Sequence, residues 1–390
     1  MIFKSASPLS PTVDISIDKV PTDYTQMQRV TIEEEENKHT LVTIDISGIN
    51  PETVSDYIDK PISIKIDFDG VTGINFVGYI VFLEPTSVTH DGLVNHSSFQ
   101  ITRMYCMSSS YIMKSKKSKS WENVTISDIA VSIADTYKLS VAVPKDSYRF
   151  TRLVQTNQSD WSFLVDACKK LGYSITITGT NLHIWDPYKL FGRNISYAVL
   201  KSITGSYGNV VPTYGQIISF EGRIGAVTTS ATRTSDTLHI LDKDGLLMSL
   251  SSSITDDTSG LSNSLESLFT DTLNINVDNY EMGKRIVEGA LRRKFSNTAK
   301  VVVTSSPELR PGSIVKVDKY NSKLDGFWYV KSAKHELTKS ELFTTLMIAT
   351  DGTTTTTPVS NTVETFVEPP TSSLVSDVWV SSTHSAVIYS

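Results

Sequence analysis

Cysteine is scarce in this chain of 390 residues: Cys106 and Cys168 are the only two, and 62 positions separate them. Two isolated cysteines without a Cys-x-x-Cys pattern exclude a disulfide framework and a cysteine-based zinc site, so both are predicted to be buried thiols. No stretch approaches the ~18 consecutive apolar residues of a transmembrane helix, and no basic segment followed by an apolar run opens the chain. The sequence therefore predicts no stable membrane insertion, with synthesis and assembly in the cytoplasm.

A strong excess of charge of one sign is also missing. The formal net charge is −6 and charged residues make up 20% of the chain, so sequence-specific binding of nucleic acid is not indicated. One local exception is a basic run at Lys114, Lys116, Lys117 and Lys119. Because it lies between strand-like segments, we interpret it as a solvated strand end or hairpin tip rather than a phosphate or lipid contact.

No catalytic frame is recognisable. Neither cysteine lies in a glycine-containing nucleophile context, and His335 follows a strand-like segment without a nucleophile or paired carboxylates, so it is interpreted as a structural or hydrogen-bonding residue. The acidic run Glu33 to Glu36 is interpreted as an exposed loop rather than a metal site. The sequence predicts a protein that is not an enzyme, with no catalytic residue, no metal site and no cofactor.

The first 120 residues follow a period of two. Val42, Ile44 and Ile46 alternate with polar neighbours, and the segment 62–68 repeats the pattern. Such alternation is typical of half-buried strands, and turns at this spacing favour a small barrel or sandwich. Residues 1–120 are therefore predicted to form a first β-barrel domain.

The period then changes to 3.6 residues, which predicts an α+β module over residues 121–200. Thr125 and Asp128 fit a capping box before a helix at about 126–136. Ser159 fits the N-cap of a second helix at about 160–171, and Gly172 fits its left-handed end. A β-hairpin ending at Trp185 follows directly.

Residues 201–352 are predicted to form a second β-barrel domain. It would contain an insertion at about 221–275 and a helix at about 279–294, whose capping box is Asp278 and Glu281. Residues 353–390 are polar and dotted with valine, so this extended C-terminal tail is predicted to be disordered or to fold on a partner. We hypothesise that Val378 and Val380 add a strand to a partner's sheet. The fold class predicted is α+β, mainly β.

Two segments resemble parts of one family, the phage late-control D proteins and baseplate hubs, which include the hub part of type VI secretion valine–glycine-repeat spikes. The first segment carries Trp161, Phe163, Gly172 and Trp185; the second carries Pro311, Gly312, Gly326, Trp328 and His335. Together they run from about residue 121 to 350. Nothing after residue 352 resembles a spike, so the resemblance implies that the spike is a separate chain.

The resemblance implies a homotrimer. Two similar barrels per chain would give six in a ring, matching a hexameric tail tube on one side and a trimeric central spike on the other. The partners implied are the tail tube protein, the spike protein and baseplate wedge proteins, and the implied location is the contractile-tail baseplate of a virion.

Other functions remain open on the sequence. The same fold could serve a phage-derived contractile injection or secretion particle, or a tail protein that binds a receptor or sugar. A peptidoglycan hydrolase is the remaining alternative, although it would need two carboxylates around a sugar bond or a Cys/His pair.

Overall fold

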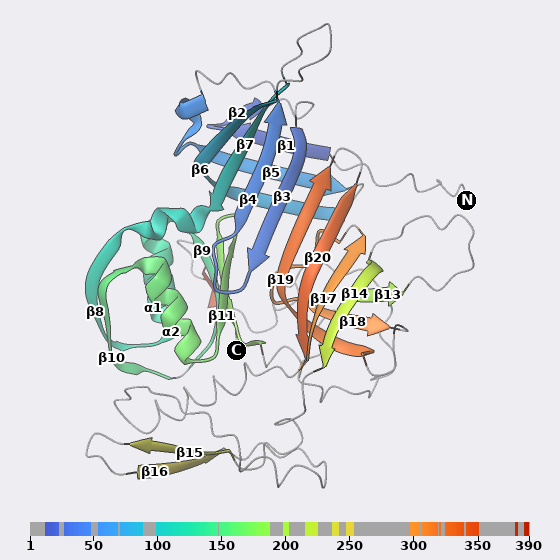
Figure 1. The fold of residues 1–390 in the computed structure, drawn as a ribbon. Coiled ribbons are helices and arrows are strands. Elements are labelled where there is room, and N and C mark those ends of the chain that lie inside the picture. The colour runs from blue at the N-terminus through green and yellow to red at the C-terminus, as the bar shows by residue number, and fades with distance from the viewer. Residues whose placement is uncertain are drawn as a thin grey trace, which may run out of the picture.

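The computed structural model is mainly β, with a small α+β module, as the sequence predicts. It describes residues 12–22, 27–47, 54–68, 71–88, 99–146, 148–187, 198–202, 215–224, 236–241, 247–252, 297–304, 306–318, 320, 324–338, 341–350, 379–380 and 386–389. Figure 1 shows many of the strands gathered in one long sheet, with the two α-helices and the strands around them to one side of it. This long sheet has 13 strands in the order β18-β13-β14-β17-β20-β19-β3-β4-β7-β6-β5-β1-β2.

The N-terminal half of this sheet, called the first β unit, contains seven of these strands. They are β1 Thr12–Ile17, β2 Val20–Thr22, β3 Met27–Glu35, β4 Leu41–Ser47, β5 Pro61–Phe68, β6 Val71–Val88 and β7 Phe99–Ser108, with short 3-10 helices η2 Val54–Tyr57 and η3 Ser109–Lys114. The predicted alternation is confirmed: Val42, Ile44 and Ile46 are buried in one core with Ile62 and Ile64. Each such side chain contributes about 1.5–3 kcal/mol on burial.

The second β unit contains six strands whose pairings run full circle. They are β13 Ala198–Ser202, β14 Gln216–Ile224, β17 Asn297–Thr304, β18 Ile314–Asp318, β19 Gly326–Thr338 and β20 Leu342–Thr350. Because β18 pairs with β19 as well as with β13, hydrogen bonding connects both ends of the run β18-β13-β14-β17-β20-β19. The described strands of the first β unit make no such return pairing, so the two units differ in closure.

One long strand joins the two units. The first half of β19 pairs with β18, and its second half pairs with β3, from Ser332 opposite Glu35 to Thr338 opposite Arg29. Leu337 and Leu342, from the β19–β20 hairpin, belong to the core of the first unit. The units are therefore fused through a continuous backbone ladder and a shared core.

The module lies between the two units in sequence and packs around its own core. Its elements are β8 Lys116–Val124, α1 Ile126–Tyr137, β9 Ser140–Pro144, β10 Phe150–Ser159, α2 Asp160–Lys170, β11 Ser174–Thr178 and β12 Asn181–Trp185. Both predicted helices are present, and Thr125 and Asp128 form the capping box. β8 and β10 pair as a long two-stranded ribbon that curves around α1 and α2 (Figure 1). The pairing groups β8 with the module, although its first residues fall in the range predicted for the first domain.

Two further strand pairs are described. β15 Asp236–Leu241 and β16 Leu247–Ser252 form a hairpin within the predicted insertion. β21 Trp379–Val380 and β22 Ala386–Tyr389 come from the C-terminal tail, and β22 runs parallel to β9 in the five-stranded sheet of the module. The predicted helix at 279–294, Val378 and the remainder of the insertion lie outside the described residues.

The acidic run Glu33 to Glu36 is not the exposed loop predicted from the sequence. Glu33, Glu34 and Glu35 continue β3, and Glu34 is buried because it has the parity of Val30 and Ile32 on the core side of that strand. Only Glu36 lies in the turn that follows. The interpretation of this segment as a loop was therefore wrong, since strand pairing to β19 extends through it.

Candidate functional site

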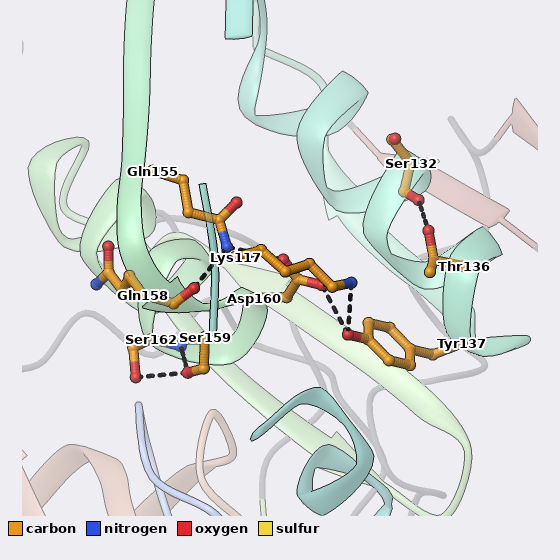
Figure 2. Close-up of polar contacts among 9 residues, drawn as sticks. All are labelled: Lys117, Ser132, Thr136, Tyr137, Gln155, Gln158, Ser159, Asp160 and Ser162. Carbon is orange, nitrogen blue, oxygen red and sulfur yellow. Dashed lines mark hydrogen bonds and ion pairs between the residues drawn. The ribbon is translucent and has the colours of Figure 1, made fainter. Parts of the chain in front are cut away.

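The start of α2 is fixed by a polar cluster of four elements (Figure 2). Ser159 caps the helix, and its hydroxyl oxygen accepts a hydrogen bond from the Ser162 N–H. The Asp160 carboxylate accepts from Lys117 Nζ at 2.7 Å, from the Tyr137 hydroxyl at 2.7 Å and from Gln155 Nε2 at 2.8 Å. These contacts tie α2 to β8, α1 and β10, so the ribbon and both helices hold one geometry.

Charge favours this arrangement. Although burial acts to raise the pKa of Asp160, the hydrogen bonds from Lys117, Gln155 and Tyr137 hold it below its usual value. The positive end of the helix dipole also favours a carboxylate in the first turn. The basic run lies at the exposed start of β8, as predicted, and Lys117, whose side chain is 43% exposed, also pairs through its ammonium with the buried Asp160 carboxylate.

Aromatic side chains on α2 connect the module outward and inward. Trp161 is buried, and its ring stacks on His39 of the β3–β4 loop with centroids 5.0 Å apart. Phe163 stacks on Trp121 of β8 at 6.0 Å. Gly172 follows the helix with φ 78°, the left-handed conformation predicted for it. Trp161 therefore connects α2 to the first β unit, whereas Phe163 packs α2 into the core of the module.

The module and both β units meet at Glu36, which we call the junction. The Glu36 carboxylate accepts hydrogen bonds from the Ser174 hydroxyl at 2.7 Å and from the Tyr329 hydroxyl at 2.8 Å. Trp185 Nε1 donates to the Tyr329 oxygen at 2.9 Å. Burial, followed by the nearby Glu36 charge, raises the pKa of Tyr329 well above its usual value, so this hydroxyl stays protonated and donates.

Gly312 completes the junction by bringing backbone close to an indole ring. A Cβ built on Gly312 would lie 3.1 Å from Cε2 of Trp185, and the residue has φ +94°. Its N–H donates to the Val330 carbonyl at 3.0 Å. Gly312, which follows Pro311 in the turn before β18, therefore meets Trp185 at the end of the module hairpin.

Ionisable groups are buried beside the junction. Glu34 Oε2 lies 3.9 Å from Arg310 Nε, and neither atom has a hydrogen-bond partner among the described residues. Burial raises the pKa of Glu34, with Arg310 acting in the opposite direction. His335 is buried in β19, and its Nδ1 lies 3.0 Å from the Thr344 hydroxyl. Burial, and then Arg310, lowers the pKa of His335 to about 3, so the imidazole is neutral.

The remaining predicted signature residues lie in the second β unit. Gly326 opens β19 with φ 142°, and Trp328 fills the core, donating from Nε1 to the Leu324 carbonyl at 2.9 Å. Val380 lies in β21, whose partner strand joins this chain's own sheet, while a pairing with another protein stays a prediction. The structure thus joins Trp185 with Gly312, and leaves Trp161 and Trp328 in separate cores.

Sequence reasoning missed Glu36, Ser174 and Tyr329 as the residues that connect the three parts. Tyr329 directly follows Trp328 in the segment that carries the resemblance, but nothing in the sequence links it to Glu36, 293 positions away. The strand parity of Val30 and Ile32 would have placed Glu34 inside, so for that residue a signal was available.

The polar cluster at α2 and the junction at Glu36 consist of hydrogen bonds and ion pairs that hold parts of the chain together. Within the described residues, no group of three or more His, Cys, Asp and Glu side chains is arranged to hold a metal ion. Cys106 and Cys168 are buried thiols, as predicted, and form no disulfide; burial raises the pKa of Cys106 to about 12, which keeps it protonated and unreactive. In the described part of the chain, no helix has the length and apolarity needed to cross a bilayer.

Two tail proteins and a type VI secretion component are among the solved structures that share this fold. The 43 kDa tail protein of prophage MuSo2 from Shewanella oneidensis is 14% identical, with a TM-score of 0.58 over 88% of this chain and 99% of that one. A tail protein from Neisseria meningitidis MC58 is also 14% identical, with a TM-score of 0.59 over 88% and 97%. The c3393 protein of E. coli, a type VI secretion component described as similar to the T4 tail proteins gp27 and gp5, is 12% identical, with a TM-score of 0.50 over 86% and 76%. At these identities the likeness establishes a shared fold.

No curated protein matches the sequence. A family described as the Alg8 N-terminal domain matches residues 11–339, a span that contains the first β unit, the module and the second β unit except for β20. That description states no activity. On this match, the chain belongs to the Alg8 N-terminal domain family.

Proposed function

We propose that this protein is the structural hub of a contractile-tail baseplate, a homotrimer that joins a hexameric tail tube to a trimeric central spike. It would act without catalysis, as a virion component assembled in the host cytoplasm and contacted by wedge proteins. The observation that carries the proposal is the fold: two β units fused in one sheet, braced by the module, in an arrangement shared over 88% of the chain with two tail proteins, one of them from a prophage.

Rigidity supports a role in transmitting force. The β19–β3 ladder fuses the units, and the junction around Glu36 ties both of them to the module through three short hydrogen bonds. Buried polar groups that are all bonded fix one geometry, because moving one part leaves a buried donor or acceptor unsatisfied. A hub that passes the thrust of a contracting sheath to a spike needs this property.

For three chains to match a sixfold tail tube, the two β units of each chain must occupy equivalent positions in a ring of six. One unit closes hydrogen bonding over six strands and the other extends it over seven, so equivalence would come from their outward surfaces and not from identical closure. The type VI component with a TM-score of 0.50 supports a phage-derived injection particle as the alternative setting for the same hub.

The test is the mass of the full chain, alone and with its spike protein, measured by native mass spectrometry. We expect three copies of this chain on one spike trimer. A chain that stays monomeric with the spike present contradicts the proposal. Lysis of cell walls in a zymogram of the purified chain would favour the hydrolase alternative instead.

A further inference from the structure

The outward face of β4, β7 and β6 carries a cluster of large apolar and aromatic side chains, which we call the aromatic patch. It consists of Leu41, Tyr79, Phe82, Tyr105 and Met107. Strand register makes them neighbours: Met107 lies opposite Leu41 on one side and Tyr79 on the other, and Phe82 lies opposite Tyr105. Phe82 is 57% exposed and Leu41 43% exposed. Figure 1 shows β3, β4 and β7 with β1 and β5 crossing behind them, on the core side of the sheet.

A β-bulge is what turns Phe82 outward. Ile80 and Leu83 both face the core, although three positions separate them, because the register of β6 against β7 shifts between Ile80 and Phe82. Because the bulge inserts one extra residue, the alternation of core-facing and outward-facing side chains resumes one position later, with Phe82 outward and Leu83 toward the core. The pleat therefore fixes the patch on the outside, and burying Phe82 in this core would require a different register.

Charged groups surround the patch. The Tyr105 hydroxyl donates to the Glu84 carboxylate at 3.0 Å, and the nearby Tyr111 hydroxyl donates to Asp59 at 3.2 Å. Lys114 Nζ lies 3.8 Å from the centroid of the Tyr111 ring. An apolar centre rich in Tyr, Phe and Met with a charged rim has the composition of a protein interface, and aromatic faces beside carboxylates attract ammonium groups.

We propose that the aromatic patch binds a second copy of this chain through the basic ribbon of that copy, formed by β8 and β10. Charge complementarity identifies this occupant. Residues 1–113 contain 7 Lys and Arg against 15 Asp and Glu, a net formal charge of −8, whereas the two ribbon strands hold Lys116, Lys117, Lys119 and Arg152 against a single acidic residue, Glu122. Opposite charge on two separate parts of one chain favours association of different surfaces on identical copies.

The ribbon offers a surface of matching chemistry. Its outward face places Val154, 53% exposed, opposite Ser120, with Lys116 toward one end of the face and Arg152, opposite the exposed Glu122, toward the other. The opposite face is anchored by the Lys117–Asp160 pair and by Trp121 (Figure 2 shows the pair). The ribbon is therefore held rigid while Val154 and the basic side chains remain available to meet Phe82 and Glu84.

This contact joins unlike surfaces, so it is heterologous. Repeated from copy to copy it closes into a ring when the rotation between copies allows, as in a trimer. The inference rests on the proposed homotrimer and assigns its contact: the patch of each copy receives the ribbon of the next.

The test uses the full chain with the spike protein and three exposed positions. Phe82→Glu disables the patch, Val154→Glu disables the ribbon, and Met347→Glu, at a side chain 42% exposed on the second β unit, is the matched control. We expect each of the first two variants to weaken association of copies by about 30-fold or more, as hot-spot losses do, and Met347→Glu to assemble like the wild type. Unchanged denaturation midpoints would establish that all three variants fold.

Mixing the two defective variants gives the sharper result. A Phe82→Glu copy keeps its ribbon and a Val154→Glu copy keeps its patch, so together they form one intact contact and yield a 1:1 pair without a closed ring. If either variant assembles like the wild type, or the mixture yields no pair, the inference is overturned while the hub proposal stands. If the wild type itself forms no trimer with the spike, the hub proposal fails first.

Discussion

Single residues decide how tightly the module is held, and Gly312 is one position that leaves little room for a side chain. A Cβ at Gly312 would lie 3.1 Å from the Trp185 ring, whereas a Cβ at Gly179, which also has positive φ, meets no atom within 4 Å. Gly179→Ala should cost only the backbone term, about 1–2 kcal/mol. Gly312→Ala should cost about 1–3 kcal/mol more, since the indole must move. Urea denaturation followed by tryptophan fluorescence measures both, and equal losses would mean that the ring yields freely.

The β19–β20 hairpin links the two β units, because it belongs to the second unit and its tip supplies Leu337 and Leu342 to the core of the first. Leu337→Ala should therefore destabilise the protein by about 2–5 kcal/mol and speed hydrogen exchange in β3 and β4. Met347→Ala, on the same hairpin but 42% exposed, should change stability by no more than about 0.5 kcal/mol. Exchange rates in β3 and β4 that stay unchanged in Leu337→Ala would contradict the shared core.

The protein as one cooperative unit should respond to acid through its buried histidine. His335 has a pKa of about 3 in the folded state and about 6.5 when unfolded. Between these values the unfolded chain binds a proton at this residue that the folded chain does not, so the contribution of His335 to stability falls as pH falls. His335→Gln should reduce this slope by up to about 1.4 kcal/mol per pH unit. Denaturation midpoints measured from pH 7 to pH 4 test this, and parallel curves for the two proteins would rule it out.

Local patterns were sufficient for the elements and for much of the core. Alternation placed Val42, Ile44 and Ile46 inside, the capping box at Thr125 began α1, and Gly172 followed α2 in the left-handed conformation, because each signal depends on neighbours a few positions away. The resemblance carried by Trp185 and Gly312 also selected residues that meet in space.

Contacts between distant segments could not be read in this way. The ladder between β3 and β19 joins residues about 300 positions apart, and the bonds of Glu36 to Ser174 and Tyr329 join three separate stretches. The β6 bulge that turns Phe82 outward likewise depends on pairing with β7. A sequence specifies which residues favour a strand, but partner, register and junction follow from packing and hydrogen-bond satisfaction over the assembled chain.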